Sequence, residues 1–261
     1  MNISPSAFRH EKEAMYLGIS SVIGVILWII LIVVAIPFLL PLAIFLWLMG
    51  QYFKTEFYGN AVHVNKGQFE EVYQTLADMA SRLKLSRVPD VFVVSGQGVL
   101  SAAAIRFLSA RFIVLHGEVV DLLLRRDAHK ELGMVLGHEL AHHVLGHTSL
   151  WKNLLLLPSR VVPFLGSAYQ RACELSADRL GMVLVGDGNA ARQALVALTC
   201  GSEVLTEKVN LEVFAAQEQQ VSRIMGFLHG LYASHPRMTR RIMELKQYET
   251  DPVFQSHVRQ A

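Results

Sequence analysis

A long uncharged segment near the N-terminus constrains the fold more than any other feature of the sequence. No charged residue occurs between Leu17 and Met49. This run is longer than the ~20 apolar residues that one helix needs to cross a bilayer. It is also too long and starts too late for the apolar core of a signal peptide, and no cleavage site of small residues follows it. The sequence therefore predicts an integral membrane protein.

Two prolines, Pro37 and Pro41, interrupt this run and leave two topologies open. One is a single long helix with a kink, and the other is a hairpin of two short helices that turns near these prolines. Two prolines so close together disrupt a helix, because proline lacks the backbone N–H and its ring clashes with the preceding turn. We therefore favour the hairpin, which would place both flanking segments on the same side of the membrane.

The rest of the chain has the composition of a soluble domain. We expect a polar N-terminal tail over residues 1–16, a transmembrane segment over residues 17–50 and a folded domain over residues 51–261, with the domain facing the cytoplasm. The net charge of +2 gives no reason to expect a nucleic-acid partner. The two cysteines, Cys173 and Cys200, form no disulfide framework, so we expect buried thiols in a reducing compartment.

Hydrophobic periodicity in this domain predicts a mostly α-helical fold with a small β-sheet, in the α+β class. Strands are predicted over residues 91–94 and 111–116. Helices are predicted over residues 65–85, 119–124, 168–185, 190–204 and 212–232, and in a basic C-terminal segment. The apolar segment 150–165 contains two prolines and two basic residues. We expect it to form a loop and a short helix that pack on the membrane face or over the active site.

The segment Gly137–His147 contains the motif His-Glu-x-x-His, with His138 and His142 at positions i and i+4. On a helix this spacing returns to nearly the same face, so both imidazoles can bind one metal ion. Glu139 lies about 100° further round the helix, where it can reach a water on the ion without binding the ion itself. Asp127 is the expected N-cap of this helix. A helix that merely carries surface histidines is the alternative, and the rest of the sequence argues against it.

A catalytic zinc ion usually takes three protein ligands, so a third ligand must come from elsewhere in the chain. The pattern His-Glu-x-x-His-x-x-Gly-x-x-His does not supply it, because Leu145 and Thr148 occupy the positions of its glycine and last histidine. Glu174, on a later predicted helix, is the other common kind of source. Asp178 follows one turn later on the same face, where it can accept a hydrogen bond from the second ring nitrogen of a ligating histidine.

Three elements of the sequence together resemble a known family. They are the His-Glu-x-x-His motif, the segment Glu174-Leu175-Ser176-Ala177-Asp178, and His235-Pro236 followed by Arg241-Ile242. This combination resembles the M48 peptidases, which are membrane-associated zinc proteases. The resemblance extends from about Gly59 to Leu245. It implies a gluzincin-type zinc peptidase domain preceded by a transmembrane segment.

The resemblance implies a role for several residues. It implies that His138, His142 and Glu174 bind one zinc ion per chain and that Glu139 is the general base. It also places His235 near the active site, where an imidazole can hydrogen-bond the tetrahedral oxyanion. One segment departs from the family: Leu100-Ser101-Ala102-Ala103-Ala104 stands where the family often has Asn-Ala-Phe-Ala. The resemblance therefore does not say how the strand edge near Ser101 would hold a substrate backbone.

Other candidate residues are expected to be structural. We expect Arg241 to form an ion pair. We expect His143 and His147, off the predicted zinc face, to be packing or surface residues, and no site role for His116, His129 and His229. The basic residues Arg237, Arg240 and Lys246 are expected on a solvated helix face.

Two functions from different classes fit these observations. The first is a membrane-anchored zinc endopeptidase that acts on proteins or peptides, in protein quality control or regulated proteolysis. The second is a non-catalytic membrane protein whose zinc ion only stabilises the domain. A stabilising site is usually closed by four ligands, mostly cysteine and histidine. Only three ligands are apparent here and Glu139 is present, so the sequence favours the peptidase.

Overall fold

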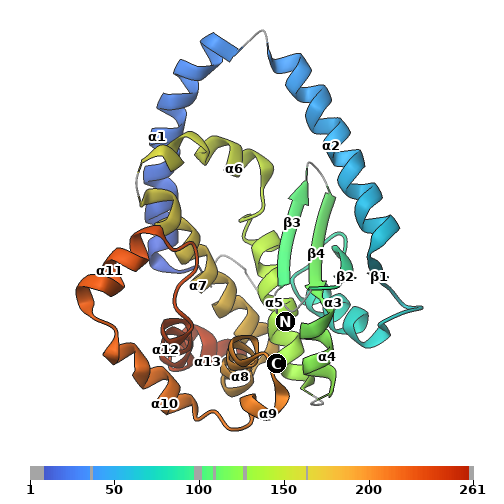
Figure 1. Cartoon of the computed structure of the whole chain (residues 1–261), viewed down its shortest axis with the longest axis vertical. Coiled ribbons are helices and arrows are strands. Elements are labelled where there is room, and N and C mark those ends of the chain that lie inside the picture. Colours follow the sequence, from blue (N-terminus) through green and yellow to red (C-terminus); the bar gives the residue numbers. More distant parts are fainter. Residues whose placement is uncertain are drawn as a thin grey trace.

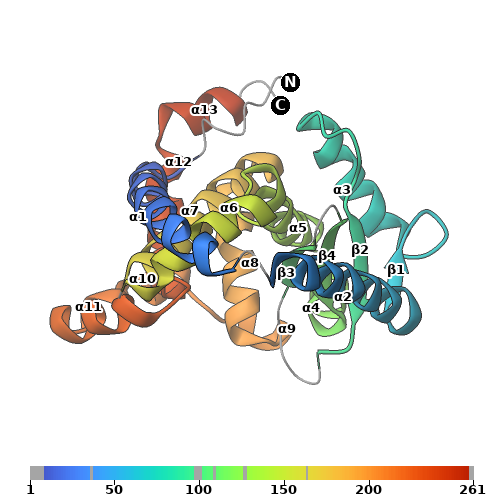
Figure 2. The same ribbon diagram turned by 90° about the horizontal axis from the view of Figure 1, so that it is seen from above.

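The computed structural model describes residues 9–35, 38–96, 102–107, 110–125, 128–162 and 164–258. Two long helices, α1 (Glu11–Ala35) and α2 (Leu39–Asn60), precede a mostly helical domain with one small sheet. Figure 1 shows α1 and α2 close together at one end and far apart where they reach the domain. Seen from above in Figure 2, α1 lies on the side of the domain away from the strands and α2 lies over the strands. The two helices therefore straddle the domain.

The long uncharged segment forms two helices separated between Ala35 and Leu39, next to the predicted turn. Pro41 falls in the first turn of α2, where the missing N–H of proline costs least. The portion Glu11–Ile32 of α1 is long and apolar enough to cross a membrane. Most of its large apolar side chains are exposed, for example Ile29 at 64%. This exposure is unlike that of a core helix in a soluble protein.

A short helix packs against α1. The segment predicted as a loop and short helix forms α6 (Leu150–Leu156) and the 3-10 helix η3 (Pro158–Val161). A Cβ added at Gly24 of α1 would lie 2.1 Å from the carbonyl oxygen of Leu155, so only glycine allows this approach. The indole Nε1–H of Trp28 donates a hydrogen bond of 2.6 Å to the carbonyl oxygen of Leu154.

The sheet has four strands in the order β1-β2-β4-β3. The strands are β1 (Val62–Val64), β2 (Asp90–Val94), β3 (Ala102–Phe107) and β4 (Ala110–His116). The strands β2 and β4 pair in parallel, and the two outer strands pair antiparallel to them. Strands β2 and β4 were predicted. The hydrophobic pattern does not predict β1, which has three residues, or β3, which begins with alanines of low strand propensity, and only the family resemblance places a strand near Ser101.

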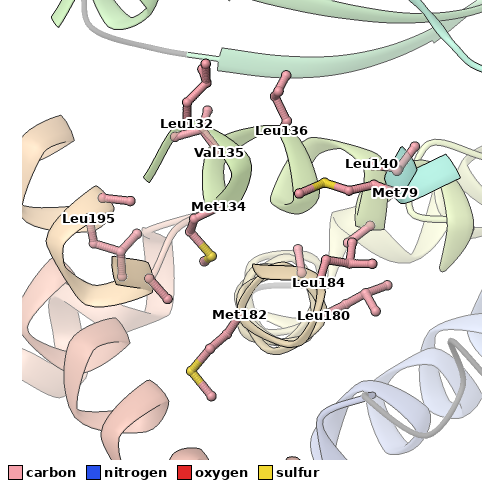
Figure 3. Close-up of a cluster of buried hydrophobic side chains, with 14 of the residues drawn as sticks. Met79, Leu132, Met134, Val135, Leu136, Leu140, Leu180, Met182, Leu184 and Leu195 are labelled. Atoms are coloured by element: carbon pink, nitrogen blue, oxygen red, sulfur yellow. The ribbon is translucent and has the colours of Figure 1, made fainter. Parts of the chain in front are cut away.

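The core lies on both sides of α5 (His129–Val144), between the sheet and α7 (Leu165–Val185). Figure 3 shows Leu132 and Leu136 of α5 on the side that faces the strands, and Leu180 and Leu184 on α7. These four side chains are 0–2% exposed. Burial of each contributes about 1.5–3 kcal/mol. The helix α5 is therefore held on two opposite faces.

The remaining helices surround this core. They are α3 (Glu70–Arg82), α4 (Gly117–Arg125), α8 (Gly188–Cys200), α9 (Glu203–Thr206), α10 (Leu211–Ala216), η4 (Gln217–Gln220), α11 (Arg223–Tyr232), α12 (Met238–Glu249) and α13 (Pro252–Val258). The prediction of one helix over residues 212–232 is wrong, because the polar run Gln217–Gln220 forms a 3-10 turn before α11. The basic C-terminal helix ends at Glu249, and Pro252 begins a separate helix. The predicted cap Asp127 lies outside the described residues.

Candidate metal centre

Facing glycines let α5 and α7 cross closely. A Cβ added at Gly137 on α5 would lie 3.2 Å from the Cα of Gly181 on α7. A Cβ added at Gly181 would lie 3.1 Å from the backbone nitrogen of His138. Larger residues at either position would force the helices apart, because close-packed interiors leave no room for them. This close crossing brings the side chains of Glu174 and Asp178 on α7 to His138 on α5.

Three predicted ligands converge at this crossing. The Nε2 atoms of His138 and His142 lie 3.1 Å apart. The carboxylate of Glu174 places Oε1 3.4 Å from Nε2 of His142 and Oε2 3.5 Å from Nε2 of His138. Ligand atoms at ~2.0–2.1 Å from a tetrahedral ion lie ~3.3 Å from one another. The three side chains therefore lie close enough together to bind a single metal ion.

The charge of this cluster also favours a cation. Burial opposes protonation of His138, but hydrogen bonds to Asp178 and Glu174 outweigh it and raise its pKa to about 10. Burial and the neighbouring His138 lower the pKa of His142 well below its usual value. Burial acts to raise the pKa of Glu174, but the two histidines lower it far below the normal range. A buried site that stabilises positive charge and keeps its carboxylates ionised suits a divalent ion.

Asp178 lies behind His138. Its Oδ1 is 2.9 Å from Nδ1 of His138. Arg241 on α12 donates from Nε to Oδ2 of Asp178 at 2.7 Å and from Nη2 to Oδ1 at 2.6 Å. Burial would raise the pKa of Asp178, but the Arg241 guanidinium lowers it overall. The expected ion pair of Arg241 thus holds the carboxylate that orients a predicted ligand.

His147 lies behind His142, and the sequence alone does not reveal this contact. We expected His147 on the motif helix, but α5 ends at Val144 and Gly146 adopts the left-handed conformation at φ +74°. After this turn, Nδ1 of His147 lies 2.9 Å from Nδ1 of His142. A Gly at the second position after a helix is the sequence signal that could have revealed this end of the helix.

Glu13, at the start of α1, extends the contacts behind His147. Its Oε1 lies 3.3 Å from Nε2 of His147, and its side chain also pairs with Arg9 and accepts a hydrogen bond from Ser176. Glu13 is fully buried. Glu13 falls in the predicted polar tail over residues 1–16, and no local pattern in the sequence links it to a residue 134 positions away.

The two predicted catalytic side chains lie close to the ligands. Glu139 follows His138 on α5 and is 5% exposed. His235 lies between α11 and α12, with Nε2 3.7 Å from Oε1 of Glu174, and its side chain is 67% exposed. Its Nδ1 lies 2.8 Å from Oγ of Ser234. His235 therefore stands at the solvent-exposed rim of the cluster, and Glu139 is buried next to His138 along α5.

Other candidates take structural positions. His143 is buried and packs with Nε2 3.0 Å from the carbonyl oxygen of Phe112, as expected. Cys173 and Cys200 are free thiols, the first buried and the second half-buried. Each residue of the basic C-terminal face pairs with a glutamate: Arg237 with Glu218, Arg240 with Glu244 and Lys246 with Glu212. In the segment 100–104, which differs from the usual family sequence, residues 100 and 101 lie outside the described part of the chain and Ala102 begins β3.

Comparison with known proteins identifies the family. A sequence model of peptidase family M48 matches residues 66–158 and 150–249, which include the whole ligand cluster. A similar relative is the plastoglobule-localized metallopeptidase 48, chloroplastic, of Arabidopsis thaliana. It is 25% identical over 227 residues, which cover 78% of this chain and 64% of the relative, so the chain spans less than two thirds of that protein's length. Because the family match covers most of the chain and both helices of the metal centre, the chain belongs to the metal-dependent peptidase family M48.

Proposed function

We propose that this chain is a membrane-anchored zinc endopeptidase. The observation that carries the proposal is the convergence of His138, His142 and Glu174 at the crossing of α5 and α7. Two histidines and a glutamate are a ligand set of catalytic zinc sites, which keep one position for water or substrate. A zinc site that only stabilised the fold would be closed by four ligands, mostly cysteine and histidine.

The protein's own residues would move the proton and hold the substrate oxygen. When bound, zinc supplies a Lewis acid that polarises the scissile carbonyl and makes water more acidic. Glu139 takes the proton of the water that attacks the carbonyl carbon and returns it to the amine as the C–N bond breaks. His235, at the exposed rim, donates a hydrogen bond to the oxygen that becomes negatively charged.

The edge of the sheet suits an extended polypeptide substrate. Among the described strands, β3 pairs with β4 alone and is an edge of the sheet. Figure 1 shows it beside α5, the helix that carries the histidine motif. An edge strand offers backbone N–H and C=O groups that can pair with an added strand. Such pairing requires an unfolded substrate segment, which supports endopeptidase action in protein quality control or regulated proteolysis.

The metal assignment is tested by measuring the zinc content of the purified full-length protein. We expect about one zinc ion per chain, and we expect chelation to remove both the ion and the hydrolysis of peptides. Replacing His138, His142 or Glu174 with alanine should lower occupancy, because each variant removes one of three ligands. The exposed His229 on α11 provides the matched control, and His229→Ala should keep its zinc. Full occupancy in Glu174→Ala would show that the third ligand is another residue.

The membrane assignment predicts a hairpin with the catalytic domain in the cytoplasm. If α1 and α2 both cross the bilayer, tags at residues 1 and 261 should be accessible from the same, cytoplasmic side. Protease protection of each tag in sealed vesicles measures this directly. Protection of one tag and cleavage of the other would mean a single span, and protection of both from the cytoplasmic side would reverse the orientation.

A further inference from the structure

Glu13 is a buried carboxylate at the start of the helix proposed to enter the membrane. A buried charge is costly unless it is paired and hydrogen-bonded. Glu13 has partners from three parts of the chain: Arg9 in its own segment, Ser176 on α7 and His147 after α5. Ser176 stands between Glu174 and Asp178 on α7, and its Oγ also accepts a hydrogen bond of 2.9 Å from the backbone N–H of His10. The first turn of α1 is therefore bonded to the helix that carries the third ligand.

The hydrogen positions along this chain of contacts follow from the metal ligand. If His142 binds an ion through Nε2, its remaining hydrogen is on Nδ1. That N–H can only donate to Nδ1 of His147, which lies 2.9 Å away. His147 must then carry its own hydrogen on Nε2, and this N–H donates to Oε1 of Glu13 at 3.3 Å. Each donor meets an acceptor, so one set of tautomers satisfies all three side chains.

We propose that Glu13 is a positioning residue of the metal centre, which acts through His147 to fix the orientation and tautomer of His142. The inference rests on the proposed function only in that His142 binds the ion. His138 is oriented by Asp178, which is held by Arg241 on α12. His142 is oriented in the same way by His147, which is held by Glu13 on α1. The helix that anchors the protein is thus a structural part of its metal centre.

A second metal ion is the competing explanation of the same cluster. Ligand atoms of Glu13, His147 and Cys173 lie within 4.8 Å of one another. The hydrogen-bonded chain excludes this use of His147, because the Nε2 atom that faces Glu13 carries a hydrogen and has no free lone pair. Glu13 is also already paired with the guanidinium of Arg9. The two explanations differ in the number of ions bound per chain, which can be measured.

The test compares zinc affinity, measured by competition with a chromogenic chelator, in full-length variants in detergent. We expect Glu13→Ala and His147→Phe each to weaken zinc binding by about 10–100-fold, the usual effect of losing such a supporting partner. Glu13→Gln keeps an amide oxygen that can accept from His147, so it should restore part of the loss. Because the two residues act in series, the double variant Glu13→Ala/His147→Phe should lose no more than the larger single loss.

Controls separate positioning from general damage. Trp28→Phe removes a contact between α1 and α6 far along the same helix, and it should leave zinc affinity unchanged. In cobalt-substituted protein, the visible absorption bands should shift in Glu13→Ala and stay as in the parent in Trp28→Phe, since they report ligand geometry. Unchanged affinity in Glu13→Ala, alongside a clear loss in His142→Ala, would overturn the inference and leave the peptidase proposal intact. The inference would also be overturned if the parent protein bound two ions per chain and Glu13→Ala lost one of them. Zinc binding that follows the expected pattern without any peptide hydrolysis would contradict the proposed function alone.

Discussion

Glu139→Gln should abolish most peptide hydrolysis and leave zinc content unchanged. Glutamine has nearly the same size as glutamate and can hydrogen-bond a water, but it cannot accept the proton. Loss of a general base typically lowers the rate by about 10²–10⁴-fold. The turnover of a fluorogenic peptide and the zinc content, measured on the same preparation, test this expectation. A variant that cleaves at the parental rate would show that Glu139 is not the base.

Asp178→Asn is the informative comparison for this variant. Asparagine keeps the shape of the side chain but loses the charge that faces His138 and Arg241. We expect zinc affinity or activity to fall by about 10–100-fold, because Asp178 acts through the orientation of a ligand. A lower zinc affinity in Asp178→Asn than in Glu139→Gln would distinguish a residue that supports a metal ligand from one that transfers the proton. Equal zinc loss in both would instead place Glu139 among the ligands.

Arg241→Met should destabilise the folded protein strongly. The guanidinium of Arg241 is the charge partner of Asp178, and both side chains are buried. Removal of one partner of a buried pair leaves an uncompensated charge and typically costs about 3–5 kcal/mol. Chemical denaturation of the detergent-solubilised protein should show this as a lower free energy of unfolding.

Two further variants test the cause of this loss. Arg240→Met changes the neighbouring residue, which is half exposed and pairs with Glu244 at 3.6 Å, so it should cost less than about 1 kcal/mol. The double variant Arg241→Met/Asp178→Asn should recover part of the stability, because the buried carboxylate is then neutral. A loss in the double variant equal to the sum of both single losses would contradict the ion-pair explanation.

The grouping of the candidate ligands could be predicted because these residues follow local rules. The i, i+4 spacing of His138 and His142 on one helix face does not depend on the rest of the fold. Glu174 and Asp178 share one face of a helix in the same way. A single contact between that helix and α5 therefore brings both side chains to the histidines. The strands β2 and β4 were also found, since both are short apolar runs bounded by turn signals.

The rest depends on contacts that no local pattern encodes. His147 reaches His142 because α5 ends at Val144 and Gly146 adopts a left-handed conformation, whereas the spacing along an ideal helix places His147 elsewhere. Glu13 resembled an ordinary charge at the end of a membrane segment. Its burial arises from packing of α1 on α7, which is a tertiary contact. For the same reason the sequence did not show the close approach of Gly24 to α6.

The dependence of Asp178 on Arg241 sets an order of events during synthesis. Arg241 follows Asp178 by 63 residues, so a ribosome makes all three candidate ligands well before it makes the arginine. At about 5–20 residues per second, this interval lasts roughly 3 to 13 s. During this time the carboxylate behind His138 has no guanidinium to hold it, and α12 is not yet in place. Until Arg241 is made, the chain lacks the guanidinium that pairs with the buried carboxylate of Asp178, so this support for His138 is among the last parts of the candidate site to form.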